Sequence, residues 1–403
     1  MEITIPLKKQ IDPQHIDQLN YLLKFVSSQF SSVCQAEGPV LIASFEELDE
    51  PTALHLTHEA LNRIIGPRNL IYKQKIEFTN SVSVPYSSNI LEELIRNKIL
   101  IPSGQGMYTY REPFSLLIEF LDQYIVSKIA GPLKAKLEYY PSLISISTLN
   151  KTNHFTSFPQ HVLFTSHLSE DFTAIDDFTQ SVKDSGGLHV EQLESAHLKP
   201  APYTKNPAVC YHCYQALEAE QIKEGQIVTA VGRCSRYESN NHDAFGRLLD
   251  FSMREIIFVG SDEFVQSNRA ASHTLLKECL SEWMTDGFFE NANDPFFTND
   301  YNIKSFFQRD LEMKYELRFT VPYLNSSLAV ASSNYHGNVF GDSFSIKADG
   351  KPAVTGCLAF GLERWVLAFL AQYGLAKENW PPAIQHQFVK WNEQRTYHMV
   401  QKV

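Results

Sequence analysis

The sequence predicts an α+β fold with a central, mostly antiparallel sheet flanked by helices and preceded by a small N-terminal α/β unit. Strand-like runs follow one another in the second half of the chain, and one of them, Arg247–Val259, places alternate residues on opposite faces. Other segments, such as Arg111–Ala130, carry apolar residues at helical spacing. A chain of 403 residues that is 43% hydrophobic can also bury a sizeable core.

Residues 1–85 are expected to form the N-terminal unit, whose role the sequence leaves open. Its first element is an amphipathic helix from about Pro13 to Ser32, with apolar residues along one face. A strand at Pro39–Phe45, a helix at Ala53–Ile65 and a strand at Ile71–Phe78 are expected to follow.

Residues 86–403 are expected to form a second, larger domain. Leu91–Ile101 predicts a helix that leads into a short apolar run, which the turn Pro102-Ser103-Gly104 closes. Beyond the helix at Arg111–Ala130, strands alternate with helices, and Gly361 begins a helix that continues to Leu375. The strands expected in this domain are Val162–Thr165, Ile227–Gly232, Arg247–Val259, Glu316–Pro322 and Ala353–Phe360.

Composition and charge exclude several classes of protein. Six cysteines are too few for a disulfide scaffold, and the first ten residues lack the layout of a signal peptide. The longest apolar stretch, Ala353–Ala376, is interrupted by Glu363 and Arg364, so no run reaches the roughly 20 apolar residues of a membrane span. The expected location is therefore the cytoplasm. A net charge of −11 speaks weakly against a broad nucleic-acid-binding surface.

Arg236-Tyr-Glu238 is the first candidate functional motif, at the end of a strand and before a polar loop that returns as the strand Arg247–Val259. This spacing places a guanidinium and a carboxylate on one face. Arginine suits an α-phosphate because its planar fork donates two hydrogen bonds at once, and the carboxylate can accept from an adenine amino group. Taken alone, such a motif is more often an ordinary ion pair on a surface hairpin.

Two further motifs are ambiguous when each is taken alone. Gly361-Leu-Glu363-Arg364 lies at a strand-to-helix junction inside apolar sequence, where its charges must reach a cleft or pair internally. Internal pairing is the commoner explanation. The polar cluster Ser332–His336, followed by Phe340-Gly341, is expected to be a loop, and turn chemistry is its commoner explanation.

Cysteine spacing leaves the choice of metal ligands open. Cys210-Tyr-His-Cys213 has metal-like spacing, but no second CxxC accompanies it, and a single CxxC is more often incidental. Spacing alone does not select Glu255 or Cys357 as a partner for it. Three further cysteines are expected to be buried thiols: Cys34, Cys234 and Cys279.

Taken together and in this order, these motifs resemble the catalytic core of class II aminoacyl-tRNA synthetases. Arg236-x-Glu238 with its returning strand resembles motif 2, and Gly361–Arg364 resembles motif 3. The chain is most similar to amino acid:[carrier protein] ligases, relatives of methanogenic-type seryl-tRNA synthetases that lack tRNA aminoacylation. The likeness covers about two-thirds of the chain. Further segments that carry it start at Asn97, His154, Cys210, Met253 and Ser332.

The resemblance implies a zinc site of two cysteines and one glutamate, at the positions of Cys210, Glu255 and Cys357. Cys213 competes with Cys210, which we prefer because Tyr214 then also falls on a family position. Three protein ligands leave the fourth tetrahedral position of zinc open, as in working rather than structural sites. In the family, the α-amino group of the substrate takes that position.

The resemblance also implies roles for the motif residues. Arg236 and Arg364 would be catalytic: Arg236 would hold the α-phosphate of ATP, and Arg364 would stack on adenine and reach the γ-phosphate. Glu238 would contact adenine, Mg²⁺ would neutralise the polyphosphate, and Phe251 or Phe258 would supply an aromatic stacking partner. The residues expected to contact the amino acid are Glu255, Ser332 and Asn334.

The implied reaction activates a small amino acid with ATP and transfers it to the phosphopantetheine thiol of a carrier protein. The implied architecture is a class II synthetase-like catalytic domain over residues 86–403, in a homodimer and without tRNA as a partner. The sequence departs from the pattern at Asn325–Val330, where an acidic Mg²⁺ ligand is expected. Two alternatives stay open: a seryl-type enzyme that charges tRNA, and a catalytically silent regulatory paralogue. The latter would be expected to lose Arg236, Arg364 or a zinc ligand, and all are present.

Overall fold

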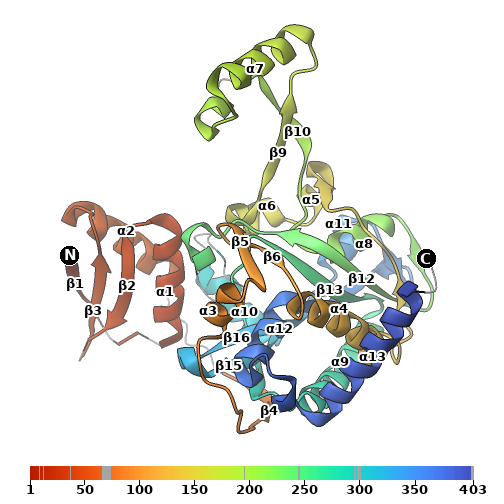
Figure 1. Cartoon of the computed structure of the whole chain (residues 1–403). Helices are drawn as coiled ribbons and strands as arrows, with labels where there is room; N and C mark the ends of the chain where they lie inside the picture. Colours follow the sequence, from red (N-terminus) through yellow and green to blue (C-terminus); the bar gives the residue numbers. More distant parts are fainter. Residues whose placement is uncertain are drawn as a thin grey trace.

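The computed structural model describes residues 1–8, 10–11, 13–36, 38–65, 74–194, 196–243, 246–294, 296 and 301–400. A small N-terminal unit lies beside a larger body built on one central sheet, and an arm projects from the body (Figure 1). None of the helices in the described ranges is both long and apolar enough to cross a membrane.

The N-terminal unit is a three-stranded antiparallel sheet with two helices packed against it. The strand order is β1-β3-β2, and the apolar sides of the helices pack on the sheet. Its elements are β1 (Glu2–Pro6), α1 (Pro13–Val26), β2 (Phe30–Gln35), β3 (Val40–Phe45) and α2 (Glu50–Ile65). This confirms the expected strand before Phe45 and the helix that ends at Ile65.

The first helix is shorter than predicted, because α1 ends at Val26 and Phe30 already begins β2. Phe30 is buried and meets the ring of Phe45 edge-on, with centroids 5.5 Å apart. The periodicity of the apolar residues therefore predicted the wrong end for this helix. Phe30 continues the helical pattern in sequence, but it is buried as a residue of a strand. Part of the strand expected at Ile71–Phe78 lies outside the described residues.

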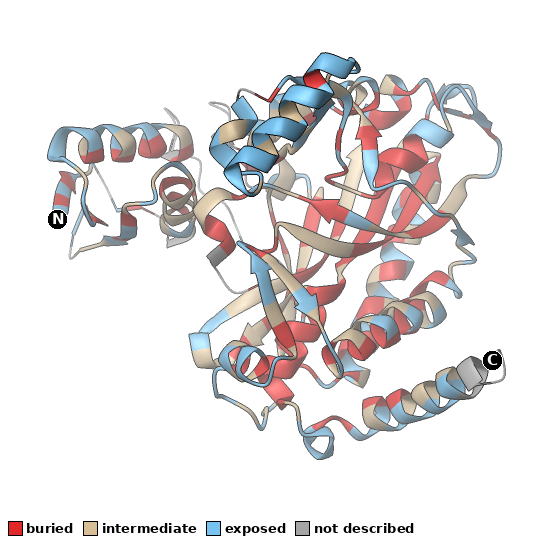
Figure 2. Ribbon diagram, turned by 45° about the horizontal axis from the view of Figure 1, so that its top comes forward, coloured by how far each residue is buried: buried red, intermediate tan, exposed pale blue. Residues whose placement is uncertain are grey.

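An eight-stranded sheet forms the centre of the body, and its buried residues are concentrated in the middle strands (Figure 2). All neighbouring strands are antiparallel except β7, which runs parallel to β12. The order is β4 (Ile76–Asn80), β14 (Gly287–Asn291), β15 (Lys314–Val321), β16 (Ser326–Gly337), β19 (Val354–Gly361), β13 (Asp250–Gly260), β12 (Gln226–Ser235) and β7 (Lys136–Leu137). The predicted α+β fold with a central antiparallel sheet is thus confirmed.

Helices cover one face of this sheet, and the other face carries the polar residues discussed below. Ile256, Phe258, Leu358 and Phe360 point to the helical face and belong to the main core. Because residues alternate along a strand, Glu255 and Cys357 point to the opposite face. The covering helices are α4 (Phe114–Ile125), α9 (Asp262–Glu282), α12 (Leu362–Tyr373) and α13 (Pro382–Val400).

The remaining elements connect these layers. The helices among them are α3 (Ile90–Arg96), α5 (Ile146–Lys151), α6 (His154–Ser157), α8 (Cys210–Ala216), α10 (Tyr301–Asp310) and α11 (Val339–Ser343). The short strands are β5 (Leu100–Gly104), β6 (Met107–Tyr110), β8 (Leu143–Ser145), β11 (Gln221–Ile222), β17 (Lys347–Ala348) and β18 (Lys351–Pro352).

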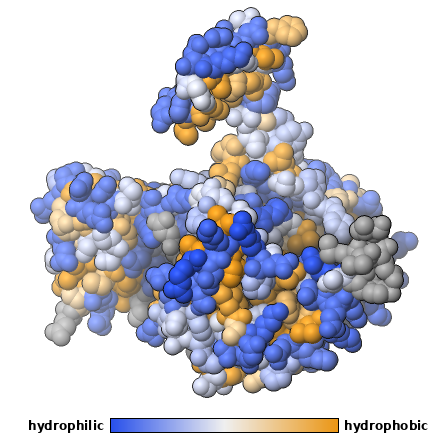
Figure 3. Space-filling view, in the orientation of Figure 1, coloured by the Kyte–Doolittle hydropathy of each residue, from blue (hydrophilic) through white to orange (hydrophobic). Residues whose placement is uncertain are grey.

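The polar cluster at Ser332–His336 is not a loop, as the sequence had suggested, but the C-terminal part of β16. Its composition is typical of a turn, whereas in the fold Ser332, Asn334 and His336 line a cavity from a central strand. Ser333 faces the other side and accepts a hydrogen bond from Arg269. The arm consists of β9 (Phe164–Leu168), α7 (Phe172–Ser185) and β10 (Leu198–Lys205). Hydrophobic residues gather along its lower side in Figure 3.

A buried ion pair ties α4 to the sheet and leads to a stability prediction. The guanidinium of Arg254 on β13 donates two hydrogen bonds of 2.7 Å to Asp122, and its side chain is 4% exposed. Removing the carboxylate leaves a buried charge without its partner, so Asp122→Ala should lower the free energy of unfolding by about 3 kcal/mol in urea titrations. Glu119 lies on α4 as Asp122 does and makes an exposed ion pair with Arg395 of α13. Glu119→Ala, which breaks that pair, should lower the free energy of unfolding by less than about 1 kcal/mol. Equal losses in the two variants would contradict this.

Candidate active site

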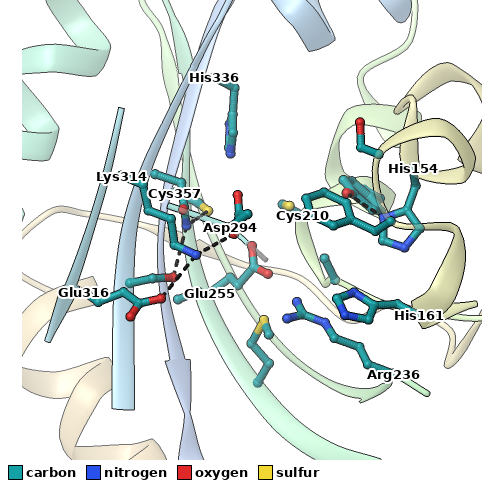
Figure 4. Close-up of a pocket in the computed structure, with 18 of the residues that line it drawn as sticks. His154, His161, Cys210, Arg236, Glu255, Asp294, Lys314, Glu316, His336 and Cys357 are labelled. Carbon is teal, nitrogen blue, oxygen red and sulfur yellow. Dashed lines mark hydrogen bonds and ion pairs between the residues drawn. The ribbon is translucent and has the colours of Figure 1, made fainter. Parts of the chain in front are cut away.

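A cavity of about 410 Å³ opens on the polar face of the central sheet. Strands β13, β16 and β19 form its floor, and α8 and the segment of α6 form part of its walls (Figure 4). All the site residues selected from the sequence line it: Cys210, Arg236, Glu238, Phe251, Glu255, Ser332, Asn334, Cys357 and Arg364.

The three predicted metal ligands come together from three elements. Cys210 begins α8, Glu255 lies on β13 and Cys357 on β19, and one ligand atom of each lies within 4.8 Å of the others. All three residues are buried. The structure therefore places Cys210 in this cluster, whereas the Cys213 thiol interacts with Tyr140.

Glu255 shows how well a cation would fit this cluster. Its Oε1 accepts a hydrogen bond of 3.1 Å from the amide of Val209, while its buried Oε2 has no hydrogen-bond partner among the described residues. Burial raises the pKa of the Glu255 carboxyl above its usual range. Two thiols and an unsatisfied carboxylate oxygen are the donor set that suits zinc. The side-chain amide of Asn334 also donates to Cys357 Sγ at 3.5 Å, which orients the sulfur.

Two of the arginines selected from the sequence also line the cavity. The Arg236 guanidinium lies 5.6 Å from the ring centre of Phe251 and donates from Nε to the carbonyl of Pro207 at 3.0 Å. The Nε of Arg364 donates to the carbonyl of Gly246 at 2.7 Å. Burial, together with neighbouring arginines, lowers the pKa of Arg364 to about 10. These two guanidinium groups make the cavity suited to polyanions.

Glu238 is the carboxylate among these arginines. Arg247 donates to Glu238 Oε2 at 2.7 Å. Burial by itself would raise the pKa of Glu238, but the charges of Arg247 and Arg364 outweigh it and hold the pKa at about 2. Glu238 is therefore ionised at neutral pH and can accept hydrogen bonds.

The structure separates the two aromatic candidates for stacking. Phe251 lines the cavity, whereas Phe258 is fully buried in the core on the helical face of the sheet. The alternation of β13 explains this difference: the two positions are seven apart, an odd number, so they fall on opposite faces.

Charged residues on the far wall of the cavity were missed in the sequence. The Lys314 ammonium donates to Asp294 and lies 3.2 Å from Glu316, so one buried cation bridges two carboxylates (Figure 4). Glu316 pairs across the sheet with Ser332, and Lys314 with Asn334. The alternation of Lys314 and Glu316 with the buried Tyr315 and Leu317 was the available signal, because charges at every second position of a central strand must face a polar site.

Histidines in the cavity wall predict an acid-sensitive fold. Burial lowers the pKa of His154 to about 3, and of His161 and His336 to about 4. An unfolded chain binds these protons near pH 6.5, so the stabilisation is complete above that value and is lost as the pH falls towards 4. We expect the free energy of unfolding to decline over this range, and His161→Gln to make the decline shallower in urea titrations at stepped pH. An unchanged slope in that variant would contradict the buried neutral state.

Comparisons with known proteins identify the relationship. No family model matches the chain. The type-2 serine–tRNA ligase of Methanocaldococcus jannaschii is 26% identical over 391 residues, which cover 89% of this chain and 74% of that protein. The Methanopyrus kandleri seryl-tRNA synthetase, solved with the tRNA-Sec of A. aeolicus, superimposes with a TM-score of 0.71 at 20% identity, over 96% of this chain and 77% of that one. The Pyrococcus horikoshii enzyme, solved with ATP, gives 0.54 at 11% identity, over 78% and 64%.

These relatives correct two expectations. They support a ligase, but the predicted carrier-protein ligase is contradicted, because the similar proteins are named for serine and tRNA. The expectation of a carrier protein rather than tRNA as partner is wrong for the same reason, since the relative from M. kandleri is seen bound to tRNA. The motifs could not separate these acceptors, because the roles that the resemblance implies for them concern ATP and the amino acid and not the acceptor. The chain is related to the catalytic core of methanogenic-type seryl-tRNA synthetases and has the class II aminoacyl-tRNA synthetase fold.

Proposed function

We propose that this protein is a seryl-tRNA synthetase, which activates serine with ATP and transfers the seryl group to tRNA. One arrangement carries the proposal: a single cavity is lined both by a candidate metal cluster and by the cationic groups of motifs 2 and 3. The names of the relatives support serine as the amino acid and tRNA as the acceptor.

In the first step, a carboxylate oxygen of serine attacks the α-phosphorus of ATP. A bond forms between that oxygen and phosphorus, the bond to the bridging oxygen of the β-phosphate breaks, and pyrophosphate leaves with the electron pair. Arg236 is proposed to hold the α-phosphate in line for attack, and Arg364 to bind the outer phosphates. Most of the acceleration then comes from positioning and charge stabilisation, since the protein forms no covalent bond.

Recognition of the adenine and of serine falls to two groups of residues that line the cavity. The ionised Glu238 is proposed to accept from the adenine amino group, with Phe251 as the stacking surface. For serine, Cys210, Glu255 and Cys357 would hold zinc, whose open fourth position would supply a ligand site for the α-amino group. Ser332 and Asn334 are proposed to contact the amino acid, and their position in the lining of the same cavity supports this. Mg²⁺ would enter with ATP and neutralise the phosphates.

In the second step, the terminal hydroxyl of tRNA attacks the carbonyl carbon of the seryl adenylate. The new ester bond forms, the bond between the carbonyl carbon and the phosphate oxygen breaks, and AMP leaves. The proton of the hydroxyl passes to the departing phosphate or to water. No protein group needs to change its charge permanently.

Amino-acid-dependent ATP–pyrophosphate exchange tests the first step, scanned over the common amino acids with and without a zinc chelator. Exchange with serine that the chelator abolishes is expected, followed by charging of serine tRNA with radioactive serine. Exchange without charging would contradict the tRNA assignment. Exchange driven by another amino acid would contradict serine, and no exchange from zinc-loaded protein would contradict the proposed activity as a whole.

A further inference from the structure

Helix α1 of the N-terminal unit packs directly on Ser239–Asp243, which follow Glu238 and begin the motif 2 loop. Figure 1 shows α1 on the side of the N-terminal unit that faces the body. The side-chain amide of Asn240 donates to the carbonyl of Lys24 at 3.0 Å, and that of Asn241 donates to the carbonyl of Tyr21 at 3.0 Å. Because the last four carbonyls of a helix lack partners within it, Asn240 caps α1. The loop and the helix therefore hold each other in place.

Tyr21 extends this contact to the residues of the nucleotide site. Its hydroxyl donates to Glu238 Oε2 at 3.2 Å, and its ring lies 4.8 Å from the guanidinium of Arg247. Arg247 donates to the same carboxylate oxygen. Two donors on Oε2 fix the rotation of the Glu238 carboxylate, whose residue lines the cavity. A side chain 217 positions away in sequence thus orients the group proposed to recognise adenine.

A second contact joins the N-terminal unit to the lining of the cavity. Phe296 is buried in the core of the N-terminal unit and stacks on Phe158, with ring centres 5.1 Å apart. Both phenylalanines line the cavity, and Phe296 is two residues from Asp294, the partner of Lys314. The N-terminal unit therefore contacts the cavity at two places.

We propose that Tyr21 is a positioning residue of the nucleotide site, so that the N-terminal unit completes the recognition of adenine. The inference rests on the proposed function in one respect, that the cavity binds ATP. Tyr21 acts through Glu238: its hydroxyl aligns the carboxylate, and its ring shields the ion pair with Arg247 from water. Both effects favour the hydrogen bond that Glu238 accepts from the adenine amino group.

Tyr21→Phe removes the hydroxyl and keeps the ring over Arg247. We expect it to weaken ATP binding about tenfold by isothermal titration calorimetry, the loss of about one hydrogen bond to a charged group. The KM for ATP in pyrophosphate exchange should rise similarly, while the KM for serine stays within about twofold. Binding of inosine triphosphate, which has an oxo group in place of the amino group, should not change. If Tyr21 only stabilised the fold, Tyr21→Phe would weaken the binding of both nucleotides by the same factor.

Tyr86→Phe is the matched control, because the Tyr86 hydroxyl also donates to a carboxylate, that of Glu93, outside the cavity. It should leave ATP binding unchanged. Equal ATP affinity in Tyr21→Phe and the wild type, or equal losses for both nucleotides, would overturn the proposal. Failure of the wild type to bind ATP would overturn it as well. Tight ATP binding without serine-dependent exchange would instead contradict the proposed function. The role of Tyr21 would then be decided by the affinities of Tyr21→Phe and the wild type for ATP and inosine triphosphate.

Discussion

Replacing Cys357 with alanine is expected to remove zinc and amino-acid activation together. Cys357 is one of three candidate ligands, and two protein ligands hold zinc far more weakly than three. Without the metal, the α-amino group of the substrate loses its anchor, so the rate of pyrophosphate exchange should fall at least about 100-fold. Metal content of the zinc-reconstituted protein and the exchange rate are measured on the same preparation.

Cys213→Ala is the control for this experiment. Both thiols are buried and similar in exposure, at 1% for Cys213 and 3% for Cys357, so the two substitutions remove a similar packed volume. The Cys213 variant should keep its zinc and most of its activity. Zinc retained by Cys357→Ala, or lost from Cys213→Ala, would contradict the assignment of the ligands.

The candidate site residues were largely accessible from the sequence, because they lie in motifs that resemble those of a known family and follow in the same order along the chain. Arg236, Glu238 and Arg364 could be proposed from the motifs, and the cavity brings all three together. Glu255 and Cys357 could not be selected by spacing, since they lie on separate strands. The antiparallel pairing of β13 with β19 makes them diagonal neighbours on one face, with Glu255 opposite Ala359 and Cys357 opposite Ile257.

Other features depend on tertiary contacts that a linear pattern does not contain. The sequence predicts only that Tyr21 lies on an amphipathic helix. The packing of α1 against the larger body is what brings its hydroxyl to Glu238. Lys314 on β15 pairs with Asp294, which lies in the connection after β14, so only the fold brings the two charges together. Phe30 fits a helix by spacing, yet packs on Phe45 from a strand, because burial outweighs the weak helical preference of its serine-rich flanks.

Replacing Arg236 with alanine is expected to lower kcat/KM for pyrophosphate exchange by roughly 10²–10³-fold while leaving the fold intact. The arginine lines the cavity, and its guanidinium contacts a backbone carbonyl and an aromatic ring. Its charge also helps to keep the buried Glu238 ionised, but the direct ion-pair partner of Glu238 is Arg247, which the substitution leaves in place. The urea midpoint should therefore stay close to that of the wild type.

Arg236→Lys separates charge from geometry. Lysine keeps the positive charge but lacks the planar fork that donates two hydrogen bonds to one phosphate, so activity should lie between that of the wild type and that of the alanine variant. Arg395→Ala, which breaks only the exposed pair with Glu119, serves as the control and should keep full activity. If the lysine variant matched the wild type, a point charge would suffice and the bidentate role would be wrong. If the alanine variant matched it, motif 2 would not bind the α-phosphate, and the activation step would have to rest on Arg364 alone.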